Sequence, residues 1–373
     1  MNEKSSQPIL SRRDLLKLAA LTGVTVAGGH LLFTFAPWIN YEQTADRTRQ
    51  PITQSADLSR QMREMIRYAT LAANGHNTQP WTFVLREHTI EIHPDFSRRL
   101  PIVDPDHREL WISLGCALEN LLIAARATGY TAQVTYPDQA DFIRVALTED
   151  APQESPLFEA IPQRQNTRAE YDGQKLPAAE QAQLEALPLE PGVGLLFANS
   201  SAQMETLLDY VNQGNMSQYA DPAFVEELIQ WLRFNKKEAN TLRDGLYTQC
   251  TGNPVVPRWL GQMFVSGMKP QQQADSDARK LRSSSGAVVI ASESDDRTTL
   301  VRVGQVYERL ALTMTSMGIR SAFLNQPIEV TGLRPQFQNA VGLGTSLPQL
   351  LVRYGYANPM PRSLRRPVEA VIA

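Results

Sequence analysis

Two stretches of the chain carry the same helical pattern at a shift of 189 positions. Residues 114–130 and 303–319 share glycine, glutamate, leucine and a closing glycine in the same order, and their apolar positions stay in phase. Each pattern leads to a β-rich stretch, at 133–136 and farther on at 349–354. Four identities alone could arise from generic helix sequences, but the shared context favours a repeated unit. We therefore expect an α/β (α+β) fold with two pseudo-repeats in one chain, each a β-sheet packed with helices.

The first repeat shows the clearest local signals. Apolar residues at helical spacing predict a helix over residues 58–73, and short strands follow at 80–85 and 89–92. Asp104 before a proline predicts the start of the next helix, which Gly129 ends. These elements indicate a helix, a polar loop, a hairpin and a second helix.

Length and composition limit the function classes. With 373 residues, of which 42% are hydrophobic and 20% charged, the chain is long enough for two domain-sized lobes. The net charge of −3 gives no reason to expect binding to nucleic acid. Cys116 and Cys250 have no cysteine or histidine at metal-ligand spacing, so no metal site is predicted. The sequence neither predicts nor excludes a disulfide between them.

The N-terminus is the most specific short signal. Residues 11–17 read Ser-Arg-Arg-Asp-Leu-Leu-Lys and precede a moderately apolar run, which is typical of a twin-arginine export signal. The alternative is an ordinary signal anchor that contains two arginines. Residues 18–39 carry no Asp, Glu, Lys or Arg and are long enough to span a bilayer core of roughly 30 Å. We expect the twin-arginine translocase to export the chain to the periplasmic face, with this segment as a possible retained membrane anchor.

The expected domain organisation follows from these patterns. Residues 1–39 form the signal or anchor, and the polar residues 40–57 are predicted to be a linker. The first repeat covers 58–150 and the second covers 151–373. Within the second, the polar, low-complexity residues 269–285 are expected to form a mobile loop.

Three motifs of the chain resemble those of one known family. Residues 72–81, Ala-Ala-Asn-Gly-His-Asn-Thr-Gln-Pro-Trp, are similar to the nitroreductase loop in which Asn-x-Gln-Pro-Trp enters a strand. Residues 164–168, Arg-Gln-Asn-Thr-Arg, resemble the basic motif that opens a nitroreductase subunit, and Arg365-Arg366 resemble its closing residues on the phosphate side. The resemblance covers about residues 58–373. It implies a nitroreductase-like fold whose two repeats mimic a homodimer.

The resemblance also implies a cofactor and its site. Family members bind FMN between two subunits, so a duplicated chain is expected to bind one FMN at the seam between its repeats and to be a monomer. The family's usual contact to the flavin N5 falls on Leu324, Asn325 and Gln326, where this sequence departs from the common Glu-Gly. The remaining expected FMN-binding residues come from the three motifs and are Asn74, Gly75, Asn77, Gln79, Arg164, Gln165, Asn166, Arg168, Arg365 and Arg366.

The chemistry of these side chains suits FMN. Guanidinium groups match a phosphate dianion with planar, bidentate donors. Amide groups such as those of Asn77 and Gln79 offer both a donor and an acceptor to the edge of the flavin ring. Each group has a structural alternative. For the amides it is a turn, and for Arg164 and Arg168 it is a solvated helix face near Glu159 or Glu170.

The function expected from the sequence is flavin chemistry. The first hypothesis is an FMN-dependent oxidoreductase that passes electrons to a small nitro, quinone or similar oxidant. The alternative is a flavin-binding or flavin-sequestering protein without turnover. The two differ in access to the ring, which is open for catalysis and covered for storage. The sequence assigns no catalytic residue and does not identify the electron donor.

Overall fold

The computed structural model describes residues 36, 38–137 and 140–373. The twin-arginine motif and most of the apolar segment 18–39 therefore lie outside the described residues.

The first repeat contains a four-stranded antiparallel sheet. Its strands are β1 (Trp81–Arg86), β2 (Thr89–Pro94), β3 (Tyr130–Thr135) and β4 (Ile143–Glu149), in the order β1-β2-β4-β3. The predicted hairpin is confirmed, since Trp81 lies opposite Pro94 and Arg86 opposite Thr89. The long helix α5 (Arg108–Ala127) connects β2 to β3.

The second repeat has a sheet of the same connectivity. Its strands β5 (Val193–Ala198), β8 (Gly286–Ser292), β9 (Arg320–Phe323) and β10 (Leu347–Gly355) follow the order β5-β8-β10-β9, and all neighbours are antiparallel. Helix α13 (Arg297–Ser316) connects β8 to β9, as α5 connects β2 to β3. The expected α+β fold with two sheet-and-helix units is confirmed. Its origin by duplication and the domain boundaries stay predictions.

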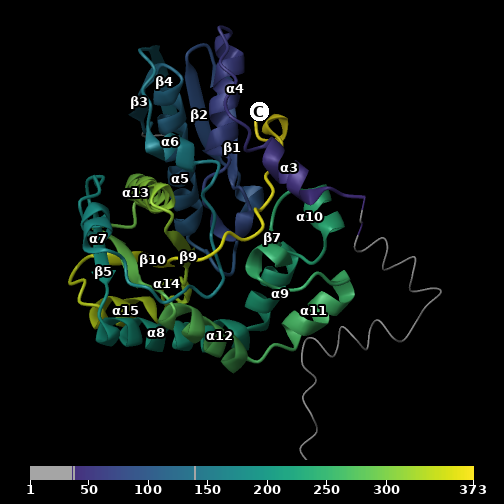
Figure 1. The fold of residues 1–373 in the computed structure, drawn as a ribbon, viewed down its shortest axis with the longest axis vertical. Helices are drawn as coiled ribbons and strands as arrows, with labels where there is room; N and C mark the ends of the chain where they lie inside the picture. The colour runs from purple at the N-terminus through teal and green to yellow at the C-terminus, as the bar shows by residue number, and fades with distance from the viewer. Residues whose placement is uncertain (1–35, 37, 138–139) are drawn as a thin grey trace, which may run out of the picture.

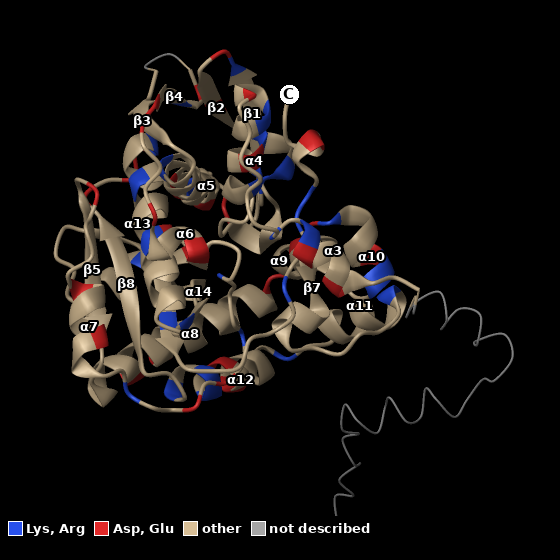
Figure 2. Cartoon of the chain, turned by 45° about the horizontal axis from the view of Figure 1, so that its top comes forward, with Lys and Arg blue, Asp and Glu red and all other residues tan. Residues whose placement is uncertain are grey.

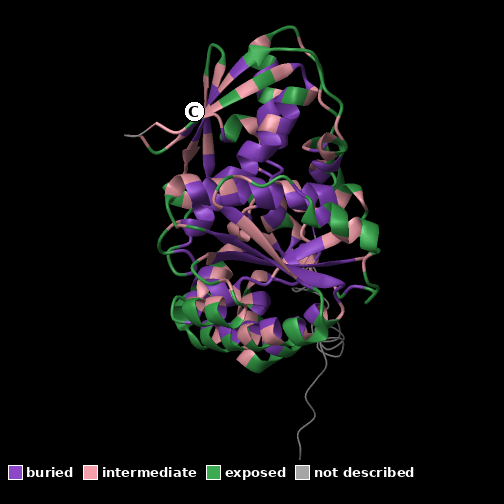
Figure 3. Ribbon diagram, turned by 90° about the vertical axis from the view of Figure 1, so that its left-hand side faces the viewer, coloured by how far each residue is buried: buried purple, intermediate pink, exposed green. Residues whose placement is uncertain are grey.

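The main hydrophobic core lies between the two sheets. Figures 1 and 3 show α5 and α13 as a buried layer with one sheet on each side. The side chains of strand β8 alternate between two cores. Val288 and Ile290 face this core, while Ala287 and Val289 face a second core. That second core lies under α8 (Ser201–Ala220), α12 (Pro270–Arg282), α14 (Gln326–Glu329) and α15 (Arg334–Ala340).

The two core helices touch at a pair of glycines. A Cβ on Gly115 would lie 2.0 Å from the carbonyl oxygen of Val301, and one on Gly304 would lie 2.0 Å from that of Ile112. These are the glycines that match in the repeated sequence pattern. Among the described residues, α5 is also apolar and long enough to cross a membrane, but it is 83% buried in its most apolar window and is a core helix here.

A further lobe, residues 221–269, is inserted between α8 and α12. We call it the insert lobe. The lobe packs against α3 (Tyr41–Arg47), whose Tyr41 and Ala45 share a small core with Ala239 and Tyr247. The elements of the insert lobe are α9 (Pro222–Trp231), β6 (Leu232–Arg233), α10 (Lys236–Leu242), β7 (Leu246–Tyr247), η3 (Thr248–Thr251) and α11 (Arg258–Ser266).

Two expectations about polar segments differ from the structure. Residues 40–57, predicted to be a linker, contain α3 and the buried Arg49, so part of this stretch belongs to the fold. The prediction of a mobile loop over 269–285 is wrong. Pro270 occupies the first turn of α12, and Ala274, Asp277 and Leu281 form its buried face at helical spacing.

The C-terminal arm returns to the first sheet. The amide of Phe83 in β1 donates to the carbonyl of Val371 (2.7 Å), and the amide of Ala373 donates to the carbonyl of Phe83 (2.9 Å). The helix predicted at 58–73 is confirmed but ends earlier, as α4 (Leu58–Ala69). The remaining short elements are η1 (Gly75–Asn77), η2 (Phe96–Arg98), α6 (Pro156–Ala160), α7 (Ala178–Glu185) and η4 (Val368–Ala370).

We predict that Gly304→Ala destabilises the protein by at least about 1–3 kcal/mol, because an added methyl group must push α5 and α13 apart within a packed core. Urea denaturation followed by circular dichroism measures this. Gly332→Ala is the matched control, since a Cβ there meets nothing within 4 Å. Equal stability of the two variants would contradict a close helix contact.

Candidate functional site

A cavity of about 50 Å³ lies where four segments of the chain meet. The segments are the loop after α4, the segment after α6, the β7–η3 part of the insert lobe, and the C-terminal arm. The lining residues are Ala73, Asn74, Asn77, Arg164, Gln165, Asn166, Arg168, Gly245, Leu246, Tyr247, Cys250, Pro361, Ser363 and Arg365. The structure thus brings together seven of the predicted binding residues, from all three sequence motifs.

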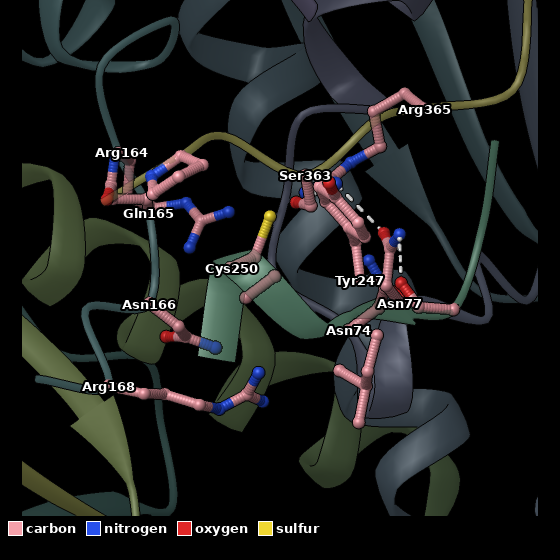
Figure 4. A pocket seen from close by; sticks show the side chains of 14 residues that line it. Asn74, Asn77, Arg164, Gln165, Asn166, Arg168, Tyr247, Cys250, Ser363 and Arg365 are labelled. Carbon is pink, nitrogen blue, oxygen red and sulfur yellow. Dashed lines mark hydrogen bonds between the residues drawn. The ribbon is translucent and has the colours of Figure 1, made fainter. Parts of the chain in front are cut away.

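Arg168 is the unusual group in this cavity. Its guanidinium makes no hydrogen bond or ion pair with any residue that the structure describes, although burial lowers its pKa. Figure 4 shows Arg168 and Asn166 extending from the same segment toward the side of the cavity that holds Cys250. Arg168 is half-buried, and a cation that is partly removed from water without a partner is costly, so this position favours an anion.

Arg164 is already paired. Its Nε lies 2.9 Å from Oε1 of Glu308 on α13, and its Nη2 donates to the carbonyl of Leu71 (2.8 Å). Glu308 also accepts from the amide of Ala73 (3.1 Å). Arg164 therefore ties the segment after α6 to α13 and to the end of α4, and its role toward a ligand stays a prediction.

Arg365 uses its hydrogen-bond donors within the protein. Its guanidinium donates to the carbonyls of Thr70, Leu71 and Ala72 just beyond the end of α4, and to side-chain oxygens of Asn77 and Ser363. An arginine has five N–H groups, and all five are used here. Burial, with repulsion from Arg49 and Arg164, places the pKa of Arg365 well below its usual value. Arg365 thus caps α4 and fixes the loop that follows.

The amides of the loop after α4 also bind backbone. Asn77 donates to the carbonyls of Gly245 (3.0 Å) and Leu364 (3.2 Å), which joins the loop to the insert lobe and the C-terminal arm. The Asn74 side chain accepts from the amide of Gln79 (2.8 Å). These contacts match the turn-building alternative left open by the sequence. Asn74 and Asn77 nevertheless line the cavity, so their binding role stays a prediction.

Several predicted residues lie away from this cavity. Gly75 lines a smaller cavity with Glu109 and Ser113. Gln79 and Arg366 bind each other, since the Arg366 amide donates to Oε1 of Gln79 (2.8 Å). Leu324, Asn325 and Gln326 lie at the start of α14, where Asn325 contacts Glu109 and Gln326 contacts Asp277 and Asn215. The expected N5-contact segment is therefore not brought to the cavity.

The three sequence motifs did not predict that residues of the insert lobe and further residues of the C-terminal arm line the cavity. Tyr247, Cys250 and Ser363 belong to no motif, and the aromatic-rich composition of the insert lobe was the only signal available. Cys250 is a buried free thiol, and so is Cys116, so the structure contains no disulfide between them. Among the described residues there is no cluster of His, Cys, Asp and Glu suited to a metal ion.

Residues of the segment before α4 support the cavity wall by binding the C-terminal arm. The Tyr41 hydroxyl donates to the carbonyl of Arg362 (2.8 Å) and lies 3.6 Å from the sulfur of Cys250. Arg49 donates to the carbonyl of Ser363 (2.9 Å). Both contacts fix the C-terminal arm where it passes the cavity. The stretch expected as a linker thus supports the site.

The cavity has a strongly positive environment. Arg49, Arg164 and Arg365 are buried in or beside it and Arg168 is half-buried, whereas Glu308 is the carboxylate that pairs with Arg164. Burial, with repulsion from Arg362, lowers the pKa of Arg49 to about 10. His76 adds no charge near neutral pH, because burial and the nearby Arg168 lower its pKa to about 4.

Comparison with known proteins gives relatives over most of the chain. No family model matches. The chain is 26% identical over 322 residues to a Mycobacterium tuberculosis protein named "Putative NAD(P)H nitroreductase Rv3131", covering 83% of this chain and 90% of that protein. The M. tuberculosis nitroreductase-type protein acg is 23% identical over 324 residues, covering 83% and 94%. The relatives support the nitroreductase family for this chain.

Solved structures match about half of the chain at low identity. The FMN-dependent nitroreductase NfnB from Mycobacterium smegmatis in complex with NADPH is 12% identical, with 58% of this chain and 91% of that chain covered and a TM-score of 0.34. Iodotyrosine deiodinase bound to FMN and 3-iodo-L-tyrosine is 11% identical, with 56% and 94% covered and a TM-score of 0.36. The support for the family comes from the sequence relatives.

We predict opposite stability effects for two cavity arginines. Arg365→Gln should lower the free energy of unfolding by at least about 3 kcal/mol, because each lost charge-assisted hydrogen bond contributes about 1.5–3 kcal/mol. Arg168→Gln should leave the stability of the ligand-free protein unchanged or raise it, since it removes a half-buried charge that has no partner among the described residues. Thermal denaturation of both variants without ligand tests this, and a large loss with Arg168→Gln would show that we have misjudged its role.

Proposed function

We propose that the chain binds FMN in this cavity and acts as an oxidoreductase of nitroreductase type. The observation that carries the proposal is the half-buried guanidinium of Arg168, which has no hydrogen-bond or ion-pair partner among the described residues and lies near three buried arginines, Arg49, Arg164 and Arg365. A phosphate dianion would supply the missing negative charge. The relatives, which are named as putative NAD(P)H nitroreductases, support the proposed reaction type.

The side chains in the cavity suit different parts of FMN. Arg168 would hold the phosphate, and the amide groups of Gln165 and Asn166 on the same segment offer donors and acceptors to the polar chain and ring edge. Tyr247, Leu246 and Cys250 provide an apolar wall for a flat ring. A cavity of about 50 Å³ accepts a phosphate-sized group, so the ring requires the wall to open.

FMN, when bound, accepts and donates a hydride or electrons, while this chain positions it and excludes water. We propose a nicotinamide donor, because Rv3131 and acg are named as NAD(P)H nitroreductases. A small nitro or quinone compound is the proposed oxidant.

A second candidate is flavin sequestration without turnover. The insert lobe and the C-terminal arm cover the cavity, and Asn77 bonds to both of them, which favours a held rather than an accessible ring. Anaerobic reduction of the purified protein separates the two functions. Rapid bleaching of bound flavin by NAD(P)H and reoxidation by a quinone support the oxidoreductase. Bleaching by dithionite alone supports sequestration.

We predict that Arg168→Ala weakens FMN binding by roughly one to two decades, since a charge-assisted contact to phosphate contributes about 1.5–3 kcal/mol. Riboflavin binding should hardly change, because riboflavin has the ring but no phosphate. Quenching of flavin fluorescence on titration of the apoprotein measures both affinities.

Arg362→Ala is the matched control, because it removes a nearby positive charge whose guanidinium pairs at 3.7 Å with Asp46 and does not line the cavity. If Arg168→Ala and Arg362→Ala have the same effect on FMN, the phosphate does not bind at Arg168. If the parent protein binds neither flavin, the cofactor proposal itself fails.

We also propose that the twin-arginine translocase exports the chain to the periplasmic face, with residues 18–39 as a membrane anchor. The support is the order of residues 11–17 and the run without charged side chains that follows. An exported site would lie apart from cytoplasmic nicotinamide, so donor use and location need separate tests.

Replacing Arg12 and Arg13 together by Lys should retain the protein in the cytoplasm, because the two groups differ in geometry although they carry the same charge. Cell fractionation with immunoblotting measures the distribution, and Lys17→Arg is the charge-neutral control. Unchanged export of the double variant would contradict a twin-arginine route.

A further inference from the structure

Helix α11 of the insert lobe exposes a cluster of large apolar side chains. Among the described residues, nine large hydrophobic side chains are exposed, and three of them lie on this nine-residue helix: Trp259 (60%), Met263 (55%) and Phe264 (41%). Trp259 and Met263 are one helical turn apart, so they share a face. The opposite side of α11 is covered, since Leu260 is buried and Gly261 packs against Phe234. The exposed face has no partner within the part of the chain described by the structure.

The apolar N-terminal segment enters the fold on this same lobe. Residues 18–39 carry no Asp, Glu, Lys or Arg, and Asn40 directly afterwards caps α3 by accepting from the amide of Gln43 (2.9 Å). Tyr41 is then buried. The chain therefore has almost no slack between the end of the apolar segment and the folded lobe, because one extended residue spans at most about 3.6 Å.

Direct contacts connect this entry point to α11. Helix α3 contacts α10 through the hydroxyl of Thr44 and Oδ1 of Asn240 (3.1 Å). Helix α10 contacts α11 through Glu238 and Arg258 (3.0 Å). Figure 1 shows α3, α10 and α11 together on the side of the molecule where the described chain begins. If residues 18–39 enter a bilayer, this group of helices lies against its surface.

The composition of this surface fits a membrane interface. Trp38 is 63% exposed and Leu242 on α10 is 48% exposed, which adds apolar area next to α11. Figure 2 shows basic residues on α10, which carries Lys236 and Lys237. Exposed tryptophan and other large apolar groups beside lysines are typical of proteins that lie at the boundary between lipid headgroups and acyl chains.

We infer that the exposed face of α11 inserts into the phospholipid surface of the same membrane that holds residues 18–39. This inference rests on the proposed membrane anchor and is independent of the proposed flavin chemistry. The lobe that covers the cavity is then fixed to the bilayer, whereas the two sheets point away from it. The membrane contact therefore involves the same lobe that supplies Tyr247 and Cys250 to the cavity wall.

The experiment uses the full chain with a nitroxide spin label at Met263→Cys, incorporated into vesicles of phosphatidylethanolamine and phosphatidylglycerol. The label at Met216→Cys on α8 is the matched control, because Met216 is similarly exposed (44%) but lies outside the insert lobe. The parent protein gives the background, since Cys116 and Cys250 are both buried. The measured quantity is the collision rate of each label with oxygen and with a water-soluble nickel chelate.

The label at 263 should collide several-fold less with the chelate than the label at 216, and more with oxygen, only when vesicles are present. Phe264→Cys gives a second position if the first variant does not fold. Equal chelate accessibility at 263 and 216 in vesicles overturns the inference. Shielding of 263 in lipid-free protein also overturns it, because a second copy or the N-terminal segment would then cover α11. Failure of the full chain to associate with vesicles would refute the anchor itself.

Discussion

The close contact of α5 and α13 at Gly115 and Gly304 determines how the two halves of the molecule are joined. With no side chain at either position, the two backbones approach closely, and the two sheets share one core across them. Glu308 lies one turn beyond Gly304 and contacts both Arg164 and the amide of Ala73. The helix that joins the halves therefore also positions two of the segments that line the cavity. A site at this seam depends on the helix crossing as much as on its own residues.

The buried arginines around the cavity divide into two kinds. Arg164 and Arg365 satisfy carbonyl groups that follow α4, which would otherwise be buried without donors, and so they build the loop. Arg168 makes no hydrogen bond or ion pair with the residues that the structure describes. A set of like charges buried together is tolerated only when hydrogen bonds or an external anion compensate it. The geometry of the donors, rather than the sequence motif, separates the structural arginines from the binding candidate.

Local sequence signals predicted the elements of the first repeat well. The hairpin at β1 and β2 follows from periodicity. The helix start predicted at Asp104-Pro105 is wrong by a few residues, because α5 begins at Arg108 after His107, although the Asp104 side chain still accepts from the amides of Glu109 and Leu110 in its first turn. The repeated glycine pattern also pointed to the two matching core helices. The cavity walls could not be predicted, because Tyr247, Cys250 and Ser363 meet only through tertiary contacts between distant segments. Helix α12 was missed because its apolar face is narrow, and polar residues dominate its composition.

The C-terminal arm completes the cavity with residues that are far along the chain from their partners. Arg365 binds Asn77 across 288 positions, and Arg362 receives the Tyr41 hydroxyl across 321. During synthesis, the loop, the basic segment and the insert lobe all leave the ribosome before residue 365 exists. The pocket therefore cannot form on a growing chain, and a ligand can be captured only after synthesis has passed this point. A bound ligand would then indicate that the whole chain has been made and has folded.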